Sequence, residues 1–145
     1  MEKLIVPARP EDAVLLKNID DVSFEKVFHE DMEYYENCFK NGNDCYLLMV
    51  NGLAAGEVIL RFEDENTIGL ESFAIVPQFR NKGLSKYLLD FVEDCAKPFK
   101  KIVLEVYVKN KKAIDIYIKN GYTMTEVKKD FYAHGYDAQI MEKIL

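Results

Sequence analysis

The sequence contains no tryptophan, only two histidines, and three cysteines that lie far apart. Cys38, Cys45 and Cys95 form no C-x-x-C pair, and two separate histidines do not complete a zinc-binding pattern with them. The odd number and wide spacing of the cysteines argue against a disulfide framework and favour reduced thiols in a cytosolic protein. We therefore expect neither disulfides nor a metal site.

Long apolar runs and an excess of positive charge are also missing. No run reaches the roughly 18–20 residues needed to span a membrane, and the first residues, MEKLIVPARPED, lack the apolar core of a signal peptide. Nineteen Lys and Arg against 25 Asp and Glu leave a formal net charge of −6, which argues against nonspecific nucleic-acid binding. We expect a soluble cytoplasmic protein whose partners include neither membranes nor nucleic acids. The sequence carries no signal for or against an oligomer.

The pattern that is present suits one α/β domain spanning residues 1–145, large enough to bury a core. Hydrophobic periodicity and turn residues predict the order βααβββαβαββ, a mixed sheet with helices on both faces. We expect strands at Lys3–Val6, Cys45–Val50, Leu53–Phe62, Thr67–Val76 and Lys101–Val108, and at about Thr123–Phe131 and Asp137–Leu145. We expect helices from Pro10, from an N-cap at Ser23 to Asn41-Gly42, from Gly83 to about Ala96, and after Asn110. The Asn51-Gly52 pair is the strongest hairpin signal.

The segment from Pro77 to Ser85, P-Q-F-R-N-K-G-L-S, joins an apolar strand to an amphipathic helix. The first N–H groups of a helix have no partner within it and form a ready site for a phosphate group, and Arg80 and Lys82 add positive charge. This segment therefore predicts a ligand that carries a pyrophosphate. The alternatives are an ordinary strand-to-helix turn and a P-loop, and the P-loop is disfavoured because the G-K-[ST] ending is absent.

Glu105 interrupts a strand that is otherwise apolar at nearly every position, as a strand buried on both faces would be. A buried carboxylate needs a partner, a raised pKa or a water-filled cleft. Alternatively, Glu105 faces solvent. Farther along, Asn110 is suited to cap the next helix, and Tyr117 shares one helix face with Ala113, although a core aromatic would show the same spacing.

These segments resemble two motifs of the GNAT N-acetyltransferase superfamily. The loop resembles its acyl-CoA pyrophosphate loop, Q/R-x-x-G-x-G/A, with Ser85 in place of the final Gly or Ala. The later segment resembles N-x-x-A-x-x-x-Y-x-x-x-G-F/Y, with five residues in register: Asn110, Ala113, Tyr117, Gly121 and Tyr122. Because the element order also matches, the resemblance covers nearly the whole chain.

The resemblance implies a GNAT fold, a mostly antiparallel sheet whose splayed central strands hold the pantetheine arm of acetyl-CoA. The backbone of Phe73, Ala74 and Ile75 would then hydrogen-bond that arm as a further strand would. The pyrophosphate would be bound by the loop residues Arg80, Asn81, Lys82, Gly83, Leu84 and Ser85. Asn110 would also contact the cofactor.

The resemblance further implies an enzyme that transfers acetyl to a primary amine. Glu105 would be the general base, Tyr117 would protonate the departing CoA thiolate, and Glu71 is the reserve candidate for the base. The run L-E-V-Y-V-K-N resembles the L-E-V-R-x-x-N of ribosomal-protein and other N-alpha-acetyltransferases, with Tyr107 replacing the arginine.

The C-terminal segment favours a particular acceptor. It resembles the Y-Y…D-A…M ending of N-alpha-acetyltransferases, in which the tyrosines line the peptide entrance, and Tyr132 keeps the second tyrosine. An aromatic-flanked hairpin would look the same. We expect the acceptor to be a protein or peptide N-terminus. The alternatives are a small-molecule amine, such as a polyamine, amino acid or aminoglycoside, and a non-catalytic acyl-CoA sensor.

Overall fold

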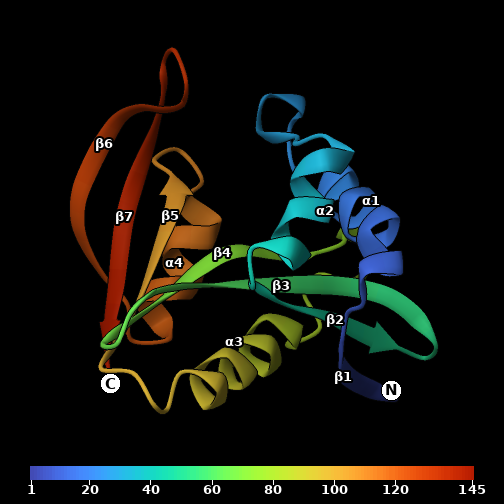
Figure 1. Ribbon diagram of the computed structural model, residues 1–145. Helices are drawn as coiled ribbons and strands as arrows, with labels where there is room; N and C mark the ends of the chain where they lie inside the picture. Colours follow the sequence, from blue (N-terminus) through green and yellow to red (C-terminus); the bar gives the residue numbers. More distant parts are fainter.

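The computed structural model describes all 145 residues as a seven-stranded mixed sheet with helices on both faces (Figure 1). The strands are β1 (Lys3–Pro7), β2 (Asp44–Val50), β3 (Leu53–Asp64), β4 (Thr67–Ile75), β5 (Lys101–Tyr107), β6 (Thr123–Ala133) and β7 (Tyr136–Ile144). The helices are α1 (Ala13–Ser23), α2 (Met32–Lys40), α3 (Leu84–Cys95) and α4 (Lys111–Lys119). The predicted element order and fold class are confirmed.

The sheet has the strand order β1-β2-β3-β4-β5-β7-β6, and every neighbouring pair is antiparallel except β4 and β5. The parallel pairing of β4 with β5 extends only from Thr67–Lys101 to Leu70–Leu104. Beyond these residues the two strands part, and the halves β1–β4 and β5–β7 diverge (Figure 1). The predicted splay of the central strands is therefore confirmed.

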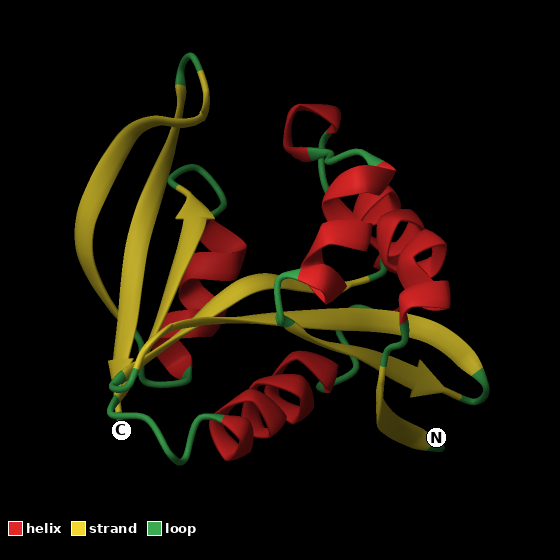
Figure 2. Ribbon diagram, in the orientation of Figure 1, coloured by secondary structure: helices red, strands yellow, loops and turns green.

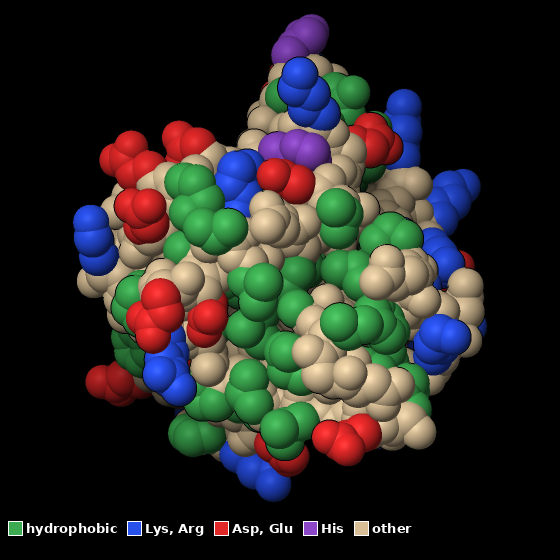
Figure 3. Space-filling view, turned by 90° about the vertical axis from the view of Figure 1, so that its right-hand side faces the viewer, with side chains coloured by type: hydrophobic (Ala, Val, Ile, Leu, Met, Phe, Trp, Pro, Cys, Tyr) green, Lys and Arg blue, Asp and Glu red, His purple; other side chains and the backbone are tan.

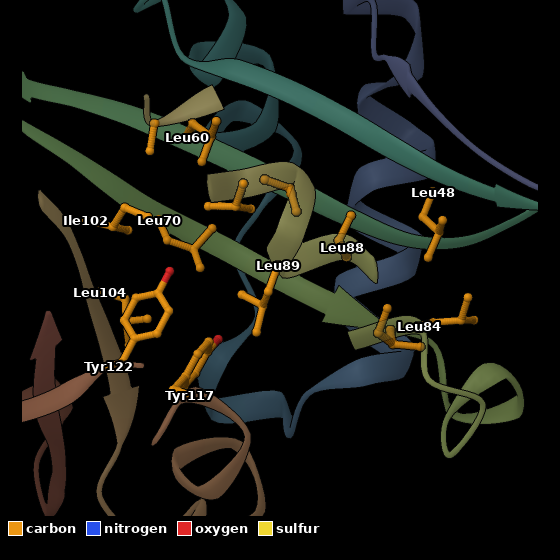
Figure 4. Close-up of a cluster of buried hydrophobic side chains, with 14 of the residues drawn as sticks. Leu48, Leu60, Leu70, Leu84, Leu88, Leu89, Ile102, Leu104, Tyr117 and Tyr122 are labelled. Atoms are coloured by element: carbon orange, nitrogen blue, oxygen red, sulfur yellow. The ribbon is translucent and has the colours of Figure 1, made fainter. Parts of the chain in front are cut away.

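The core lies in two layers, one on each face of the β2–β4 half. Helices α1 and α2 cover one face and α3 the other (Figure 2), and Leu16 of α1 and Leu88 of α3 are both fully buried. On the α3 side, the rings of Tyr117 and Tyr122 lie beside Leu104 and Leu89 (Figure 4). Each buried aliphatic side chain contributes about 1.5–3 kcal/mol, so these two layers stabilise the β2–β4 half of the sheet.

The hairpin between β2 and β3 forms as the sequence predicts. Asn51 and Gly52 both have positive φ, 49° and 79°. Two consecutive positive φ values match the right-handed twist of the flanking strands, which is why an Asn-Gly pair favours this connection.

The second helix begins later in the chain than the sequence predicts. Ser23 is the last residue of α1 rather than an N-cap, and Phe24 is extended. Helix α2 begins at Met32, where the carboxylate of Asp31 accepts a hydrogen bond from the Tyr34 N–H at 2.9 Å. A carboxylate satisfies that donor and also interacts favourably with the helix dipole. The intervening segment, with a 3₁₀ turn at Lys26–Phe28, reaches toward the β6–β7 hairpin.

Strand β5 differs from the prediction that it is buried on both faces. Ile102, Leu104 and Val106 are buried, whereas Val103 and Glu105 on the opposite face are only half-buried. On that second face, Glu105 lies beyond the last residue pair of β4 and β5 and lines the cleft.

The view in Figure 3 shows hydrophobic side chains across the middle of this face, with Lys, Arg, Asp and Glu side chains mainly around them. Val14 and Val22 of α1 are among the exposed hydrophobic residues of the molecule. None of the helices combines the length and the apolar composition that crossing a bilayer requires.

Candidate active site

A cleft of about 640 Å³ opens where β4 and β5 diverge. It is bounded by these strands, by α4, and by the segment between α1 and α2. The cleft brings together six of the residues predicted from the sequence: Glu71, Phe73, Glu105, Asn110, Tyr117 and Tyr132. The other predicted residues lie outside its lining. Ala74 and Ile75 are buried in β4, and residues 80–85 precede or begin α3.

Glu105 projects from β5 into the cleft with its side chain 19% exposed. Its Oε1 lies 3.4 Å from Nη2 of Arg61, and its other oxygen accepts no hydrogen bond. Burial raises the pKa of Glu105, and the nearby Arg61 guanidinium partly offsets this effect. Glu105 thus has a partner, a raised pKa and a cleft, all three conditions that allow a carboxylate in this strand.

Glu71 lies in the same cleft, but both of its oxygens are engaged. Oε1 accepts a hydrogen bond from Nη1 of Arg61, and Oε2 accepts one from the Tyr34 hydroxyl at 2.7 Å. Burial and the acceptor Glu71 both raise the pKa of Tyr34, so its phenol stays protonated as a donor. Glu71 is also the extra residue at a register shift between β3 and β4.

Tyr117 lines the cleft from α4 and is only 7% exposed. Its ring packs against Phe73 at 6.0 Å and Tyr122 at 5.5 Å between centroids. Burial raises the pKa of Tyr117, so at neutral pH the phenol is protonated and able to donate. Asn110 caps the same helix as predicted, since its Oδ1 accepts the Ala113 N–H at 3.2 Å.

The loop before α3 has the predicted helix N-terminus. Gly83 is the N-cap with φ of 75°, and no side chain caps the helix, so its first N–H groups have no partner in the protein. An added Cβ at Gly83 would meet no atom within 4 Å, so positive φ is what favours glycine there. The Leu84 side chain is buried, which leaves only its backbone available.

Arg80 anchors the loop to two neighbouring elements. Its Nε donates to the Ile75 carbonyl at 2.9 Å, and its Nη2 donates to the Ser23 carbonyl at 3.1 Å. Its guanidinium therefore ties the end of β4 to the end of α1, a contact that the sequence did not predict.

The backbone of β4 presents unpaired groups at the splay. The Val76 N–H donates to the Ala55 carbonyl toward β3. Because backbone groups of alternate residues point to the same side of a strand, those of Ala74 also face β3, whereas those of Phe73 and Ile75 point away from it. Strand β5 does not pair with β4 at this level, so these groups border the gap between the strands, and of them the Ile75 carbonyl already accepts the bond from Arg80.

An aromatic cluster encloses the far side of the cleft. The Phe28 ring, from the segment between α1 and α2, lies 4.9 Å from Tyr132, 5.3 Å from Tyr107 and 5.8 Å from Tyr136. We call these four residues the aromatic clasp. It connects the two diverging halves of the molecule across the cleft.

The comparisons with known proteins agree with this geometry. The model of the acetyltransferase (GNAT) family matches residues 14–122. The chain belongs to the GNAT acetyltransferase family. It is 26% identical over 144 residues to N-alpha-acetyltransferase 50 of Danio rerio, covering 94% of this chain and 84% of that protein.

Solved structures of GNAT enzymes share the fold. The ribosomal-protein-S18-alanine N-acetyltransferase of Escherichia coli superposes with a TM-score of 0.87 at 20% identity, covering 99% of this chain and 94% of that one. Naa50 of Arabidopsis thaliana, in complex with the bisubstrate analogue CoA-Ac-MVNAL, superposes with a TM-score of 0.87 at 20% identity and full coverage of both chains.

As a GNAT acetyltransferase, this protein is an N-acetyltransferase that uses acetyl-CoA as its acyl donor, and both predictions are confirmed. The residues present suit that donor. Phe73 and Ile75 offer backbone groups at the splay, and the uncapped N-terminus after Gly83 offers donors for a phosphate group.

Three residues at or beside the cleft, Arg61, Tyr34 and Phe28, were not predicted from the sequence. Arg61 and the acidic residues after it resemble a solvated strand end, and Phe28 was assigned to the second helix. Of the predicted residues, Tyr132 packs against Phe28. It was predicted to lie at an acceptor entrance, and it is part of the aromatic clasp.

Two buried carboxyl groups were also not predicted to matter, those of Asp20, which lines the cleft, and Glu57, which does not. Glu57 is fully buried and Asp20 is 5% exposed. Ser72 Oγ donates to Glu57 Oε1 at 2.6 Å, but Oε2 of Glu57 and Oδ1 of Asp20 have no hydrogen-bond partner. Burial raises the pKa of both groups, and the neighbouring Asp20 raises that of Glu57 further. Two buried carboxyl groups cannot both ionise without a counter-charge, so we infer that the pair shares one proton.

Proposed function

We propose that this GNAT enzyme, acting as one domain of residues 1–145 in the cytoplasm, acetylates the N-terminal α-amine of a protein or peptide. The amine attacks the acetyl-CoA thioester directly, and no covalent enzyme intermediate forms. The observation that carries the proposal is the pairing of two groups in one cleft. Glu105 has a free carboxylate oxygen to accept a proton, and Tyr117 has a buried phenol to donate one.

Glu105 is the proposed base. An amine must be neutral to attack, and at pH 7 roughly a tenth of an α-amine is neutral, against about 0.04% of a lysine side chain. Glu105 takes the proton as the nitrogen bonds to the acetyl carbon, either directly or through a water molecule. A positioned base contributes about 10²–10⁴-fold in rate. Glu71 is less suited, because Arg61 and Tyr34 occupy both of its oxygens.

Tyr117 is the proposed acid. The bond from the acetyl carbon to sulfur breaks, and the phenol proton passes to the departing thiolate. The Ile75 N–H, which faces the splay, polarises the thioester carbonyl as negative charge develops on its oxygen. The amine proton ends on Glu105, and the Tyr117 proton leaves with CoA as the thiol. Exchange with solvent then returns a proton to Tyr117 and removes one from Glu105, which restores the enzyme.

The donor is proposed to lie along the splay. Its pantetheine arm pairs with the backbone of Phe73 and Ile75, and its pyrophosphate meets the N–H groups of Gly83, Leu84 and Ser85. Asn81 and Lys82 flank the same turn. Arg80 contributes positive charge while it anchors the loop.

A peptide acceptor is supported by the likeness to N-alpha-acetyltransferase 50 and to the Naa50 complex with a bisubstrate analogue. We infer that the acceptor reaches Glu105 past the aromatic clasp, with Tyr132 at the entrance. Aromatic side chains can pack against a peptide backbone without demanding one side chain.

A second candidate acceptor is a small cationic amine, such as a polyamine. Acidic side chains favour it, because Glu25, Glu30, Glu71 and Glu105 all line the cleft. Burial raises the pKa of Glu30, and the charges of Asp31 and Glu71 raise it further. A cationic ligand would relieve this repulsion.

An acceptor panel tests the proposal. Purified protein and acetyl-CoA are mixed with peptides bearing free or acetylated N-termini and with polyamines and amino acids, and release of free thiol is followed. We expect turnover with free N-termini only. Faster turnover with polyamines would support the second candidate. CoA binding without turnover of any amine would identify a non-catalytic sensor.

A further inference from the structure

The guanidinium of Arg61 lies among three carboxylates where β4 and β5 part. Its Nε is 2.6 Å from Oε1 of Glu63, its Nη1 donates to Glu71, and its Nη2 is 3.4 Å from Oε1 of Glu105. The Arg61 side chain is only 26% exposed. One fixed cation thus contacts both carboxylates that were candidates for the base.

Gly69 makes this placement possible. It is the cross-strand partner of Arg61, on the adjacent strand β4. A Cβ added at Gly69 would lie 2.7 Å from Nη2 of Arg61 and 2.9 Å from its Cζ and Nε. These separations are too short for nonbonded atoms, so any side chain at Gly69 would displace the guanidinium. The backbone of Gly69 lacks the positive φ that favours glycine elsewhere in the chain, so the missing side chain is what matters there.

A planar guanidinium suits three acceptors at once. Its donors diverge in one plane, whereas the lysine ammonium is a compact charge without this fork. Because Arg61 approaches Glu105 only at Oε1, the second oxygen of this cleft-lining residue has no hydrogen-bond partner. Glu71, in contrast, has no free oxygen.

Among the charges around Glu105, that of Arg61 most strongly opposes the effect of burial on the Glu105 pKa. Burial raises the pKa of Glu105, Arg61 lowers it, Glu71 and Glu63 raise it, and Lys128 lowers it. The charged and titratable groups that face Glu105 come from three strands: Arg61 and Glu63 on β3, Glu71 on β4, and Lys128 and Tyr132 on β6.

We propose that Arg61 is a positioning residue for acetyl transfer: it orients the Glu105 carboxylate, keeps it ionised, and withdraws Glu71 from proton transfer. This inference rests on the proposed role of Glu105 as base. Arg61 itself touches neither the acceptor nor the thioester, and it acts through the two glutamates.

The pH dependence of kcat tests the proposal. Profiles are measured at saturating acetyl-CoA with one peptide throughout, for the wild type, Arg61→Gln, Arg61→Lys and Gly69→Ala. Loss of a nearby opposite charge raises a carboxyl pKa by about 1 unit or more. We therefore expect the acidic limb of the kcat profile to shift to higher pH by about that amount in Arg61→Gln and Gly69→Ala. The shift should be smaller in Arg61→Lys, which keeps the charge. Glu36→Gln, an exposed change on α2 without an ion pair, serves as the control.

A measurement without turnover accompanies the kinetics. The ¹³C signal of the Glu105 carboxyl, assigned by its loss in Glu105→Gln, is titrated in the wild type and in Arg61→Gln. We expect Glu105 to titrate at higher pH in the variant. Adding Gly69→Ala to Arg61→Gln should cause no further shift, because the group that it displaces is already gone.

The outcomes separate this inference from the proposed function. An unchanged acidic limb and an unchanged Glu105 titration in Arg61→Gln would reduce Arg61 to a structural role and overturn the inference. Full activity in Glu105→Gln would instead refute the assigned base. If Arg61→Gln fails to fold, Gly69→Ala decides in the same way, because it keeps Arg61 but moves its guanidinium.

Discussion

Replacing Glu57 by glutamine should stabilise the protein, and increasingly so as the pH rises. The raised pKa values and the burial of Glu57 and Asp20 led us to infer that the folded pair shares one proton. In Glu57→Gln, the amide oxygen can still accept from Ser72, and the amide N–H groups offer Asp20 a donor that does not titrate. A neutral amide therefore removes the requirement to protonate a carboxyl group on folding.

The direction and size of this pH dependence follow from the linkage between proton binding and folding. Because the folded pKa of the pair is raised, the stability that it contributes is complete below the ordinary carboxyl pKa and is lost as the pH rises through the folded value. While the folded pair keeps a proton that the unfolded chain has lost, the wild-type free energy of unfolding falls by about 1.4 kcal/mol per pH unit. The variant lacks this slope, so its advantage grows by about 3 kcal/mol over two such units.

Urea unfolding at pH 5, 6, 7 and 8 provides the assay for both proteins. Glu36→Gln, which changes an exposed glutamate, should shift the free energy of unfolding by less than about 0.5 kcal/mol. A constant difference between Glu57→Gln and the wild type across the series, or a variant that is less stable at every pH, would refute the shared proton.

Three further substitutions test other parts of the account. Tyr117→Phe should lower kcat by about 10²-fold or more, measured by thiol release, while the Kd for CoA from calorimetry changes little, because only the donated proton is lost. Gly83→Ala should weaken CoA binding by about tenfold in the same calorimetry, because a Cβ disfavours the φ of 75° that the turn requires. Leu88→Ala, at a fully buried position of α3, should lower the free energy of unfolding by about 2–5 kcal/mol in urea titrations.

Elements with strong local signals were predictable from the sequence. Asn51-Gly52 requires positive φ at both positions, and Gly83 lies between an apolar strand and an amphipathic helix, so the hairpin and the loop were both located correctly. Asn110 and Tyr117 were predicted on one helix, and the structure places them there. In each case, the physical cause lies within a few residues of the signal.

Features that depend on tertiary contacts were not predictable in this way. Ser23 is a good N-cap residue, but Asp31 caps the helix, and Phe28 instead joins the aromatic clasp. The function of Gly69 depends on Arg61 across the sheet, and no local pattern indicates that pair. Charged and glycine residues inside strands are therefore the positions where the structure adds most to the sequence.

Glu105 is the proposed base for the attack of a free α-amine on acetyl-CoA. The most direct measurement is the initial rate of thiol release with matched peptides, one with a free and one with an acetylated N-terminus, by the wild type and by Glu105→Gln. We predict turnover of the free peptide alone, and a fall in kcat of about 10²–10⁴-fold in the variant with the Kd for CoA nearly unchanged. Equal rates for the two peptides, or a Glu105→Gln enzyme as fast as the wild type, would contradict the account.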